Sequence, residues 1–347
     1  VYPCARSMRE PYSGINEESF SHVFSFHTSI MFNHHGQGEV AEEKRMCDME
    51  NVILFGNGLN RLNENNLSWE GLLEGMSNKI LKNNISETLQ YEDIYLSKDI
   101  KPVVGEKYND TTEYWLKKDI ADSFANYGSN DVYEILVRLP ITHYMTTNYD
   151  HALAMEMSDN SENTYNIRRK HCMIKSTKEK KFIWQIHGDI DSPRSIMLGY
   201  DHYCGQIAKI SSYVKGSYRN RITQKQIKAI VKRMESGIDI NKSTSWIDLF
   251  FSANVHIIGL KLSFDEIDLW WLLNKRIRFM REGKAPICNE IHFYDREIER
   301  NKLEIMRDFG VVVHEYSDFS SQEYMPMYKR ILHDIGTYLE TNNQFLS

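Results

Sequence analysis

Short apolar runs alternate with amphipathic segments along most of the chain. Runs rich in β-branched and aromatic residues, each followed by a turn signal, predict buried strands at residues 51–55, 141–145, 181–187, 254–259, 290–295 and 311–316. Apolar positions recur at helical spacing over residues 68–81, with Ser68 as the N-cap, and residues 114–127 and 130–139 predict two further helices. Strands that alternate with helices predict an α/β fold with a doubly wound, mainly parallel, Rossmann-like sheet.

Two segments depart from this alternation. Residues 1–48 show no sustained period of 2 or 3.6 and begin with Val. We therefore expect a poorly ordered or non-native N-terminal extension, with the folded domain over residues 49–347 and a natural start at Met46 or Met49. Residues of about 200–245 lie between two predicted strands and look helical, which indicates a helical insertion. Its basic side chains form either a solvated helix face or a surface for another subunit, a partner or nucleic acid: Lys209, Lys215, Arg219, Arg221, Lys225, Lys228, Lys232 and Arg233.

Composition narrows the classes of function. With 347 residues, of which 41% are hydrophobic and 26% charged, the chain can bury a substantial core in one large or two modest domains. No run approaches the roughly 18 consecutive apolar residues of a membrane helix. A net charge of −6 argues against a protein that coats nucleic acid with its whole surface. The five cysteines are scattered without C-x-x-C spacing, which argues against a zinc ribbon and fits reduced thiols in a cytoplasm.

A glycine-rich turn follows the first predicted strand. Gly56 and Gly58 would permit a tight turn and bring backbone amides close to a phosphate, with a helix N-terminus nearby. Arg61 occupies the position at which G-x-G-x-x-G has its third glycine. The turn is therefore either part of a nucleotide site or a simple tight turn.

Polar residues also follow three later strands, and ligands of doubly wound sheets bind at such carboxyl ends. In the sequence TTNYD, residues 146–150, Asn148 could hold a ribose hydroxyl or a water, whereas Asp150 faces a ligand or caps the next helix. His187 ends another strand before Gly188, whose missing side chain would leave room for a ligand against the ring; a structural role is the alternative. Gly259 ends a further strand.

A structural role is also predicted for the serine that follows this last strand. Ser263 and Glu266 match the S-x-x-E capping box, so helix capping explains Ser263 without any ligand.

The order of these motifs resembles that of the sirtuin fold, and more closely that of the sirtuin-like NAD hydrolase domains of bacterial antiphage defence proteins. The resemblance covers roughly residues 50–320, and the 187 − 148 = 39 residues between Asn148 and His187 are a separation typical of the family. The cysteine pairs and the Pro-Asp-Phe-Arg segment of protein-deacylating sirtuins are missing, and their Gly-x-Ser reads Gly259-Leu260-Lys261 here. These departures disfavour deacylation and leave NAD binding as the expectation.

The resemblance implies an NAD hydrolase that releases nicotinamide and ADP-ribose, and that acts as an abortive-infection effector by depleting cellular NAD. Asn148 and His187 would be catalytic, with Asn148 holding water and ribose hydroxyls and His187 accepting a proton. The residues implied to contact NAD are Gly56, Asn57, Gly58, Asn60, Thr147, Asp150, Gly259 and Ser263. The alternatives are a non-catalytic module that binds NAD or ADP-ribose or serves assembly, and then an NAD-dependent protein deacylase.

The same resemblance implies an oligomeric state, a location and a means of activation. Such an enzyme must be silent until triggered, so we expect a homo-oligomer in the bacterial cytoplasm, with a partner ATPase or a phage-derived trigger. No metal, membrane or direct nucleic-acid contact is expected. We further predict that the helical insertion forms an oligomer or partner interface and begins beside the site, because it follows soon after His187.

Overall fold

The computed structural model describes residues 49–63, 68–77, 85–100, 111–156, 162–166, 168–176, 179–219, 224–238 and 245–344, with side chains outside 157–180 and 342–344. The chain divides into two compact units, residues 1–44 and 45–347. The predicted N-terminal extension, residues 1–48, lies outside the described residues. None of the described helices combines the length and the hydropathy needed to cross a bilayer.

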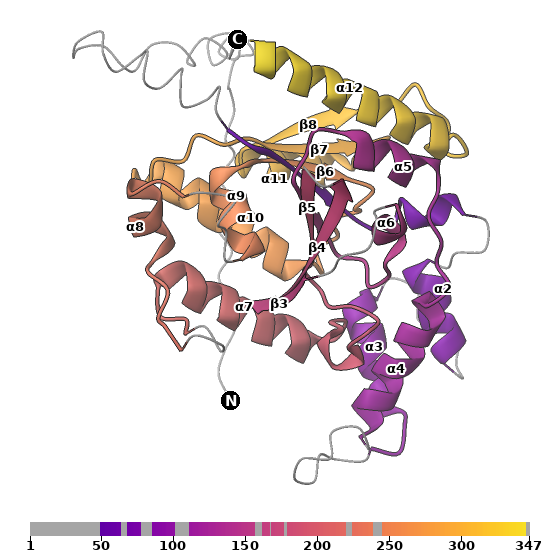
Figure 1. Cartoon of the computed structure of the whole chain (residues 1–347). Helices are drawn as coiled ribbons and strands as arrows, with labels where there is room; N and C mark the ends of the chain where they lie inside the picture. Colours follow the sequence, from indigo (N-terminus) through magenta and orange to yellow (C-terminus); the bar gives the residue numbers. More distant parts are fainter. Residues whose placement is uncertain are drawn as a thin grey trace, which may run out of the picture. The chain divides into compact units, whose positions relative to one another are not determined.

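An eight-stranded sheet lies at the centre of the second unit, in the order β3-β4-β5-β2-β1-β6-β7-β8 (Figure 1). The six strands from β5 to β8 in this order are parallel to one another. Taken in chain order they have the 3-2-1-4-5-6 arrangement of Rossmann-type folds, so the predicted doubly wound sheet is confirmed. Their bounds are Asn51–Phe55 (β1), His143–Thr146 (β2), Glu179–Gln185 (β5), Asn254–Ile258 (β6), Ile291–Asp295 (β7) and Val311–Glu315 (β8).

An antiparallel hairpin extends one edge of this sheet and was not predicted. Its strands, β3 (Glu162–Asn166) and β4 (Arg168–Ser176), pair with each other, and β4 also pairs with β5. Their sequences, ENTYN and RRKHCMIKS, lack the continuous apolar run that marks a strand buried on both faces. The hydrophobic pattern alone therefore does not predict these two strands.

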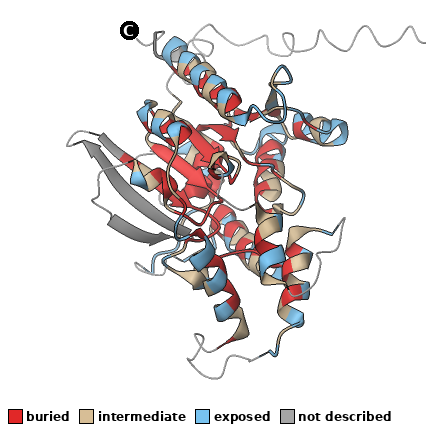
Figure 2. Cartoon of the chain, turned by 90° about the vertical axis from the view of Figure 1, so that its right-hand side faces the viewer, coloured by how far each residue is buried: buried red, intermediate tan, exposed pale blue. Residues whose placement is uncertain are grey.

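Alternate residues of each central strand pack on opposite faces of the sheet. Val52 and Leu54 of β1 belong to one apolar cluster, whereas Ile53 and Phe55 belong to another. Figure 2 shows the result, with buried residues along the strands and on the sheet-facing sides of the helices. Because both faces are covered, the free space for a ligand lies at the ends of the strands.

The helices divide between these two faces. The cluster of Val52 and Leu54 includes residues of α7 (Tyr200–Lys215), α8 (Ile230–Glu235), α9 (Trp246–Ser252), α10 (Ile267–Arg281) and α11 (Arg300–Asp308). The cluster of Ile53 and Phe55 includes residues of α5 (Asp131–Arg138), α6 (Ala152–Met155) and α12 (Tyr324–Gln344).

Three further helices form a module with its own apolar cluster: α2 (Trp69–Met76), α3 (Glu87–Leu96) and α4 (Thr112–Phe124). Ser68 caps α2 by accepting a hydrogen bond from the Gly71 amide at 3.0 Å, as predicted. The cluster also contains Tyr149 and Leu198, so the module packs on residues that follow β2 and β5. It therefore borders the carboxyl edge of the sheet.

A polar contact fastens this module to α7. His202 Nε2 lies 2.6 Å from a Glu113 carboxylate oxygen, and His202 Nδ1 accepts the amides of Leu198 and Gly199. The hydrogen bond to His202 is the largest of the effects that lower the pKa of Glu113 to about 2. The pair thus links α4 of the module to α7.

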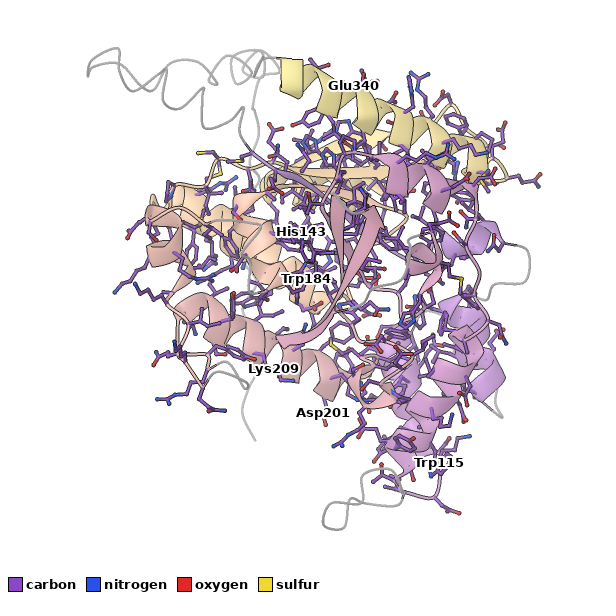
Figure 3. All side chains as sticks on the ribbon, viewed as in Figure 1. Trp115, His143, Trp184, Asp201, Lys209 and Glu340 are labelled. Carbon is purple, nitrogen blue, oxygen red and sulfur yellow. The ribbon has the colours of Figure 1, made fainter. Side chains whose placement is uncertain are left out.

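The segment predicted as a helical insertion contains α7 and α8, which form part of the layer that covers the sheet. Ile210 and Tyr213 of α7 are fully buried, while Asp201 and Lys209 are exposed on its outer side (Figure 3). Arg233 does not belong to an exposed basic surface. Its guanidinium lies 2.8 Å from the buried Asp248 carboxylate and over the Tyr213 ring.

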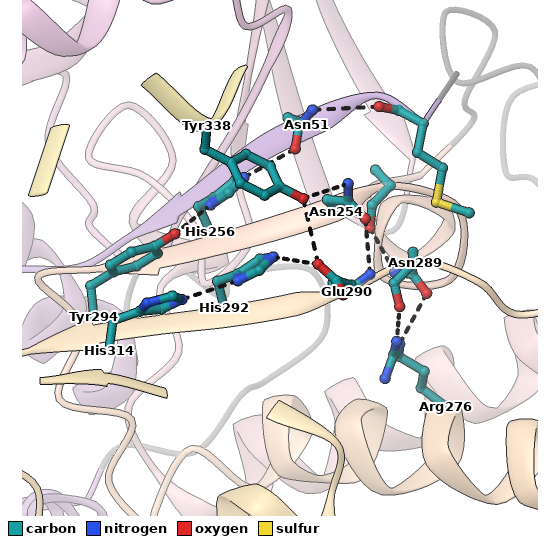
Figure 4. A network of polar contacts seen from close by, with 12 residues as sticks. Asn51, Asn254, His256, Arg276, Asn289, Glu290, His292, Tyr294, His314 and Tyr338 are labelled. Carbon is teal, nitrogen blue, oxygen red and sulfur yellow. Dashed lines mark hydrogen bonds and ion pairs between the residues drawn. The ribbon is translucent and has the colours of Figure 1, made fainter. Parts of the chain in front are cut away.

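A stack of histidines lies between the sheet and α12 (Figure 4). The rings of His256 and His292 are 4.9 Å apart and nearly parallel, and His292 Nδ1 lies 3.1 Å from His314 Nε2. His256 also contacts the Tyr294 hydroxyl at 2.9 Å through Nδ1 and Asn51 at 3.1 Å through Nε2. The other ring nitrogen of His292, Nε2, lies 3.1 Å from a Glu290 carboxylate oxygen.

Candidate functional site

The sequence motifs meet at one edge of the sheet. Phe55 is paired with both Thr146 and Ile258, and Thr146 is paired with Gln185. The residues that follow these four strand ends therefore lie side by side, since neighbouring strands are about 4.8 Å apart. The strand order reverses between β1 and β6, and the crevice outside such a point is where doubly wound sheets bind ligands.

The glycines at this edge allow two turns to touch. The Gly58 amide donates to the Gly259 carbonyl at 2.8 Å, and a Cβ on Gly58 would lie only 2.7 Å from that oxygen. Gly259 has φ +58°, which L-residues rarely adopt. The turn leads into a 3-10 helix of three residues, Asn60–Leu62, and α2 begins only at Trp69. The helix expected near the glycines is therefore this short 3-10 helix.

A buried amide network connects four of the predicted residues. Asn60 Nδ2 donates to an Asp150 carboxylate oxygen at 2.6 Å and to Asn57 Oδ1 at 3.2 Å. The Tyr133 hydroxyl donates to Asn60 Oδ1 at 2.6 Å, and Asn148 Nδ2 lies 3.5 Å from that hydroxyl. Tyr133 was missed because it lies within an amphipathic helix, where it reads as a core residue.

Asp150 and Asn148 differ in how their oxygens are engaged. Asp150 accepts the Ala152 amide at 2.9 Å at the start of α6, whose N-cap residue is His151, while its other oxygen accepts from Asn60. Burial is the main cause that raises the pKa of Asp150. Asn148 is 3% exposed, and no described residue donates a hydrogen bond to its Oδ1. Such an acceptor, buried beside a strand end, is suited to a ligand hydroxyl or a water.

A pocket opens beside this network, between the sheet edge and the helical module. It contains about 380 Å³ of space that no atom occupies, including space open to solvent at its mouth. Thr147, Tyr149 and His187 line it from the sheet edge, and Tyr203 lines it from α7. The helical segment that follows His187 thus begins beside the site, as predicted. The module and the loop before α10 complete the wall with Trp69, Glu87, Thr88, Ser263, Asp265 and Glu266.

His187 is held by a residue that the sequence did not indicate. Its Nε2 lies 3.1 Å from Asp268 Oδ2, and the two side chains are 4% and 0% exposed. Asp268 stands in the first turn of α10, where an aspartate is ordinary because of the helix dipole. Gly188 serves a different purpose from the one predicted, since a Cβ there would collide with the Ser195 backbone.

The predicted capping box at Ser263 is wrong. The helix begins at Ile267, Glu266 is its N-cap residue, and no side chain caps it. Leu262 has φ +46°, an unusual conformation for a non-glycine residue, and the chain turns there before the helix starts. Ser263 lines the pocket instead.

The pocket wall is acidic. Burial is the largest cause that raises the pKa of both Glu87 and Glu266, and the neighbouring Asp268 carboxylate raises that of Glu266 further. A raised pKa favours the neutral form of a carboxyl group, so these two side chains contribute less negative charge than exposed glutamates would.

One group of possible metal ligands occurs among the described residues. His151, Asp189 and Asp191 have ligand atoms within 4.8 Å of one another. Each of these side chains also has contacts within the protein: His151 Nε2 lies 3.7 Å from Asp191, and Asp189 Oδ1 accepts the Ser192 amide at 3.2 Å.

Comparison with known proteins identifies similar chains. Residues 142–232 match the family described as SIR2-like domain. An NAD(+) hydrolase ThsA of Cytobacillus dafuensis is 26% identical over 139 residues, which are 40% of this chain and 26% of that protein. An NAD(+) hydrolase ThsA of Bacillus cereus is 24% identical over 174 residues, which are 48% of this chain and 34% of that protein. The chain thus spans about a quarter to a third of the length of these relatives.

Solved structures were compared as well. A Sir2 variant with a deacetylated p53 peptide and 3′-O-acetyl ADP ribose aligns with a TM-score of 0.35 at 10% identity, over 85% of this chain and 98% of that one. A Sir2 homologue in complex with NAD aligns with a TM-score of 0.32 at 10% identity, over 89% and 97% of the two chains.

Proposed function

We propose that the chain, which carries a sirtuin-like domain, hydrolyses NAD to nicotinamide and ADP-ribose. One observation supports the proposal most strongly. His187 lines a pocket at the carboxyl edge of the sheet, beside the point where the strand order reverses and beside the buried Asn148. That is where a doubly wound sheet binds a dinucleotide.

Cleavage of NAD does not require a strong general acid from the protein. The nicotinamide of NAD is a cationic leaving group, so the electron pair of the breaking C1′–N bond neutralises the ring. Water forms the new bond to C1′ and gives up a proton. The site must orient the ribose, stabilise an oxocarbenium-like transition state and accept that proton.

The described residues have suitable chemistry for these tasks. His187 has an imidazole on the pocket wall and would accept the proton from water. Asn148 would accept a hydrogen bond from a ribose hydroxyl through Oδ1, to which no described residue donates. Asp265, a further carboxyl group on the pocket wall, would favour positive charge on the ribose.

The biological role proposed here is antiphage defence by depletion of NAD. It is supported by the similarity to proteins named NAD(+) hydrolase ThsA. An effector of this kind must be held inactive, so we propose a homo-oligomer or a partner, such as an ATPase or a phage-derived trigger, that controls access to the pocket.

The test is incubation of the purified protein with NAD, followed by chromatography of the products. We expect nicotinamide and ADP-ribose in equal amounts, with no product from the His187→Ala variant. Binding of NAD without nicotinamide release, in every oligomeric state and with every partner tried, would instead favour a binding or assembly module. Release of nicotinamide only in the presence of an acyl-lysine peptide would favour deacylation.

A further inference from the structure

The contact between His187 and Asp268 determines which ring nitrogen carries the proton. An ionised carboxylate can only accept hydrogen bonds. At 3.1 Å from Asp268 Oδ2, the Nε2 atom of neutral His187 must therefore be the donor. The lone pair of the ring is then on Nδ1, which has no hydrogen bond to any residue that the structure describes.

Asp268 is completely buried, and its surroundings suit a carboxylate. It stands in the first turn of α10, where the helix dipole favours a negative charge, and its Oδ1 accepts the Leu269 amide at 3.0 Å. Of the carboxyl groups that line the adjoining pocket, Glu87 and Glu266 have a raised pKa. Asp268 is the carboxyl group that contacts the imidazole.

The ring of His187 is also fixed from its other sides. The Tyr203 ring packs edge-on against it, with 5.5 Å between the centroids. The Met197 amide donates to the His187 carbonyl at 2.9 Å, and the next residue, Gly188, has φ +103° where only glycine fits against Ser195. The imidazole is thus held in one orientation by backbone, packing and a charged hydrogen bond.

We propose that Asp268 is a positioning residue that fixes His187 as the Nε2-protonated tautomer and leaves Nδ1 as the atom that accepts the proton. The proposal deepens the proposed NAD hydrolysis and rests on it. Asp268 would not touch NAD; it would orient the imidazole and stabilise the imidazolium that forms when Nδ1 takes a proton from water.

The tautomer can be measured directly in the unmodified protein. We would label the histidines with nitrogen-15 and assign the His187 signals by comparison with a His187→Gln variant. We expect a protonated Nε2 and an unprotonated Nδ1 at neutral pH. A spectrum that shows the proton on Nδ1 would overturn the proposal.

The variant Asp268→Asn tests the consequence for catalysis. Its amide can donate to Nε2 and so favours the other tautomer. We expect kcat for NAD cleavage to fall by ~10²–10⁴-fold, as when a histidine base is held in the wrong tautomer, while KM changes only a few-fold. Asp201→Asn is the matched control, because Asp201 is an exposed aspartate in the first turn of α7. Equal kcat in the Asp268→Asn variant and the control would overturn the positioning role.

Two further measurements separate the outcomes. If Asp268→Asn does not fold, Asp268→Glu is the second variant, because it keeps a carboxylate at this position. It should retain the wild-type tautomer and be more active than His187→Ala. Activity no higher than that of His187→Ala would contradict the positioning role. A wild-type protein that never releases nicotinamide would refute the proposed function, whatever the tautomer. Cleavage by the wild type together with full activity of Asp268→Asn would refute only the role of Asp268.

Discussion

Asn148 and His187 lie in places where loss of the side chain should affect chemistry more than folding. Both follow strand ends, and no described residue donates to Asn148 Oδ1. We expect Asn148→Ala and His187→Ala each to reduce nicotinamide release by ~10²-fold or more, because each would remove a contact made in the transition state. The measurement is initial rate against NAD concentration.

Their matched controls are exposed residues of the same types, Asn301→Ala and His333→Ala. These should keep wild-type rates, and all four variants should retain a cooperative thermal transition. Near-native activity of either site variant would show that the site has been placed wrongly.

Among single residues, the sequence predicted those that stand next to a recognisable local pattern. It did not predict those that reach the site only through tertiary contacts. His187 was predicted because it ends an apolar strand before a glycine. Its partner Asp268 is 81 residues away, and Tyr133 is 73 residues from Asn60. Ser263 was misread because the S-x-x-E spacing carries no information on the φ of +46° at Leu262, which delays the start of the helix.

Among the elements, the glycine turn after β1 leaves no room for a side chain at Gly58. A Cβ on Gly58 would meet both the Gly259 carbonyl and the Tyr328 hydroxyl at 2.7 Å, so one of the turns must move. We expect Gly58→Ala to lower the free energy of unfolding by about 1–3 kcal/mol, measured by denaturant titration.

The control for this substitution is Gly75→Ala. Gly75 lies in α2 with nothing within 4 Å of the added Cβ. Alanine there should raise stability by up to about 1 kcal/mol, because it is the better helix former. If both variants changed stability equally, the contact between the turns could not be the reason for the glycine at position 58.

Elements with a strong apolar signal were the ones that the sequence predicted. The six parallel strands are rich in apolar residues because helices cover both of their faces. The hairpin of β3 and β4 has no such run, so only its pairing with β5 makes it a strand. Strands near the edge of a sheet need less apolar surface than central ones, so the hydrophobic pattern does not mark them.

At the scale of the whole molecule, the histidine stack predicts how stability depends on pH. Burial, and then the neighbouring imidazoles of His292 and His314, lower the pKa of His256 to about 3, below its ordinary value of about 6.5. A group whose folded pKa is depressed stabilises the fold above its unfolded pKa, and this contribution is lost as the pH falls through the folded value. The free energy of unfolding should therefore decrease between about pH 6.5 and pH 3.

The variant His256→Asn isolates this effect. It should reduce the slope of unfolding free energy against pH in that interval by about 1.4 kcal/mol per pH unit, the value for one proton. Denaturant titrations at several pH values measure the slope. His333→Asn, an exposed change on α12, is the control. An identical slope in the wild type and His256→Asn would mean that protonation of His256 changes the free energy of unfolding little.

Assembly is the property of the whole molecule that the proposed defence role most requires. Lys225, Lys228 and Lys232 are exposed in the segment around α8, which lies in the same helical layer as α7 and its pocket residue Tyr203. We expect their reversal to Glu to change the sedimentation coefficient or partner binding, while NAD still enters the pocket.

Scattered exposed charges contribute only about 0–1 kcal/mol each, so reversal of a dispersed set should leave assembly unaltered. That control set is Arg278, Lys284 and Arg300. Identical sedimentation and partner profiles for both triple variants and the wild type would make the basic segment a solvated helical surface.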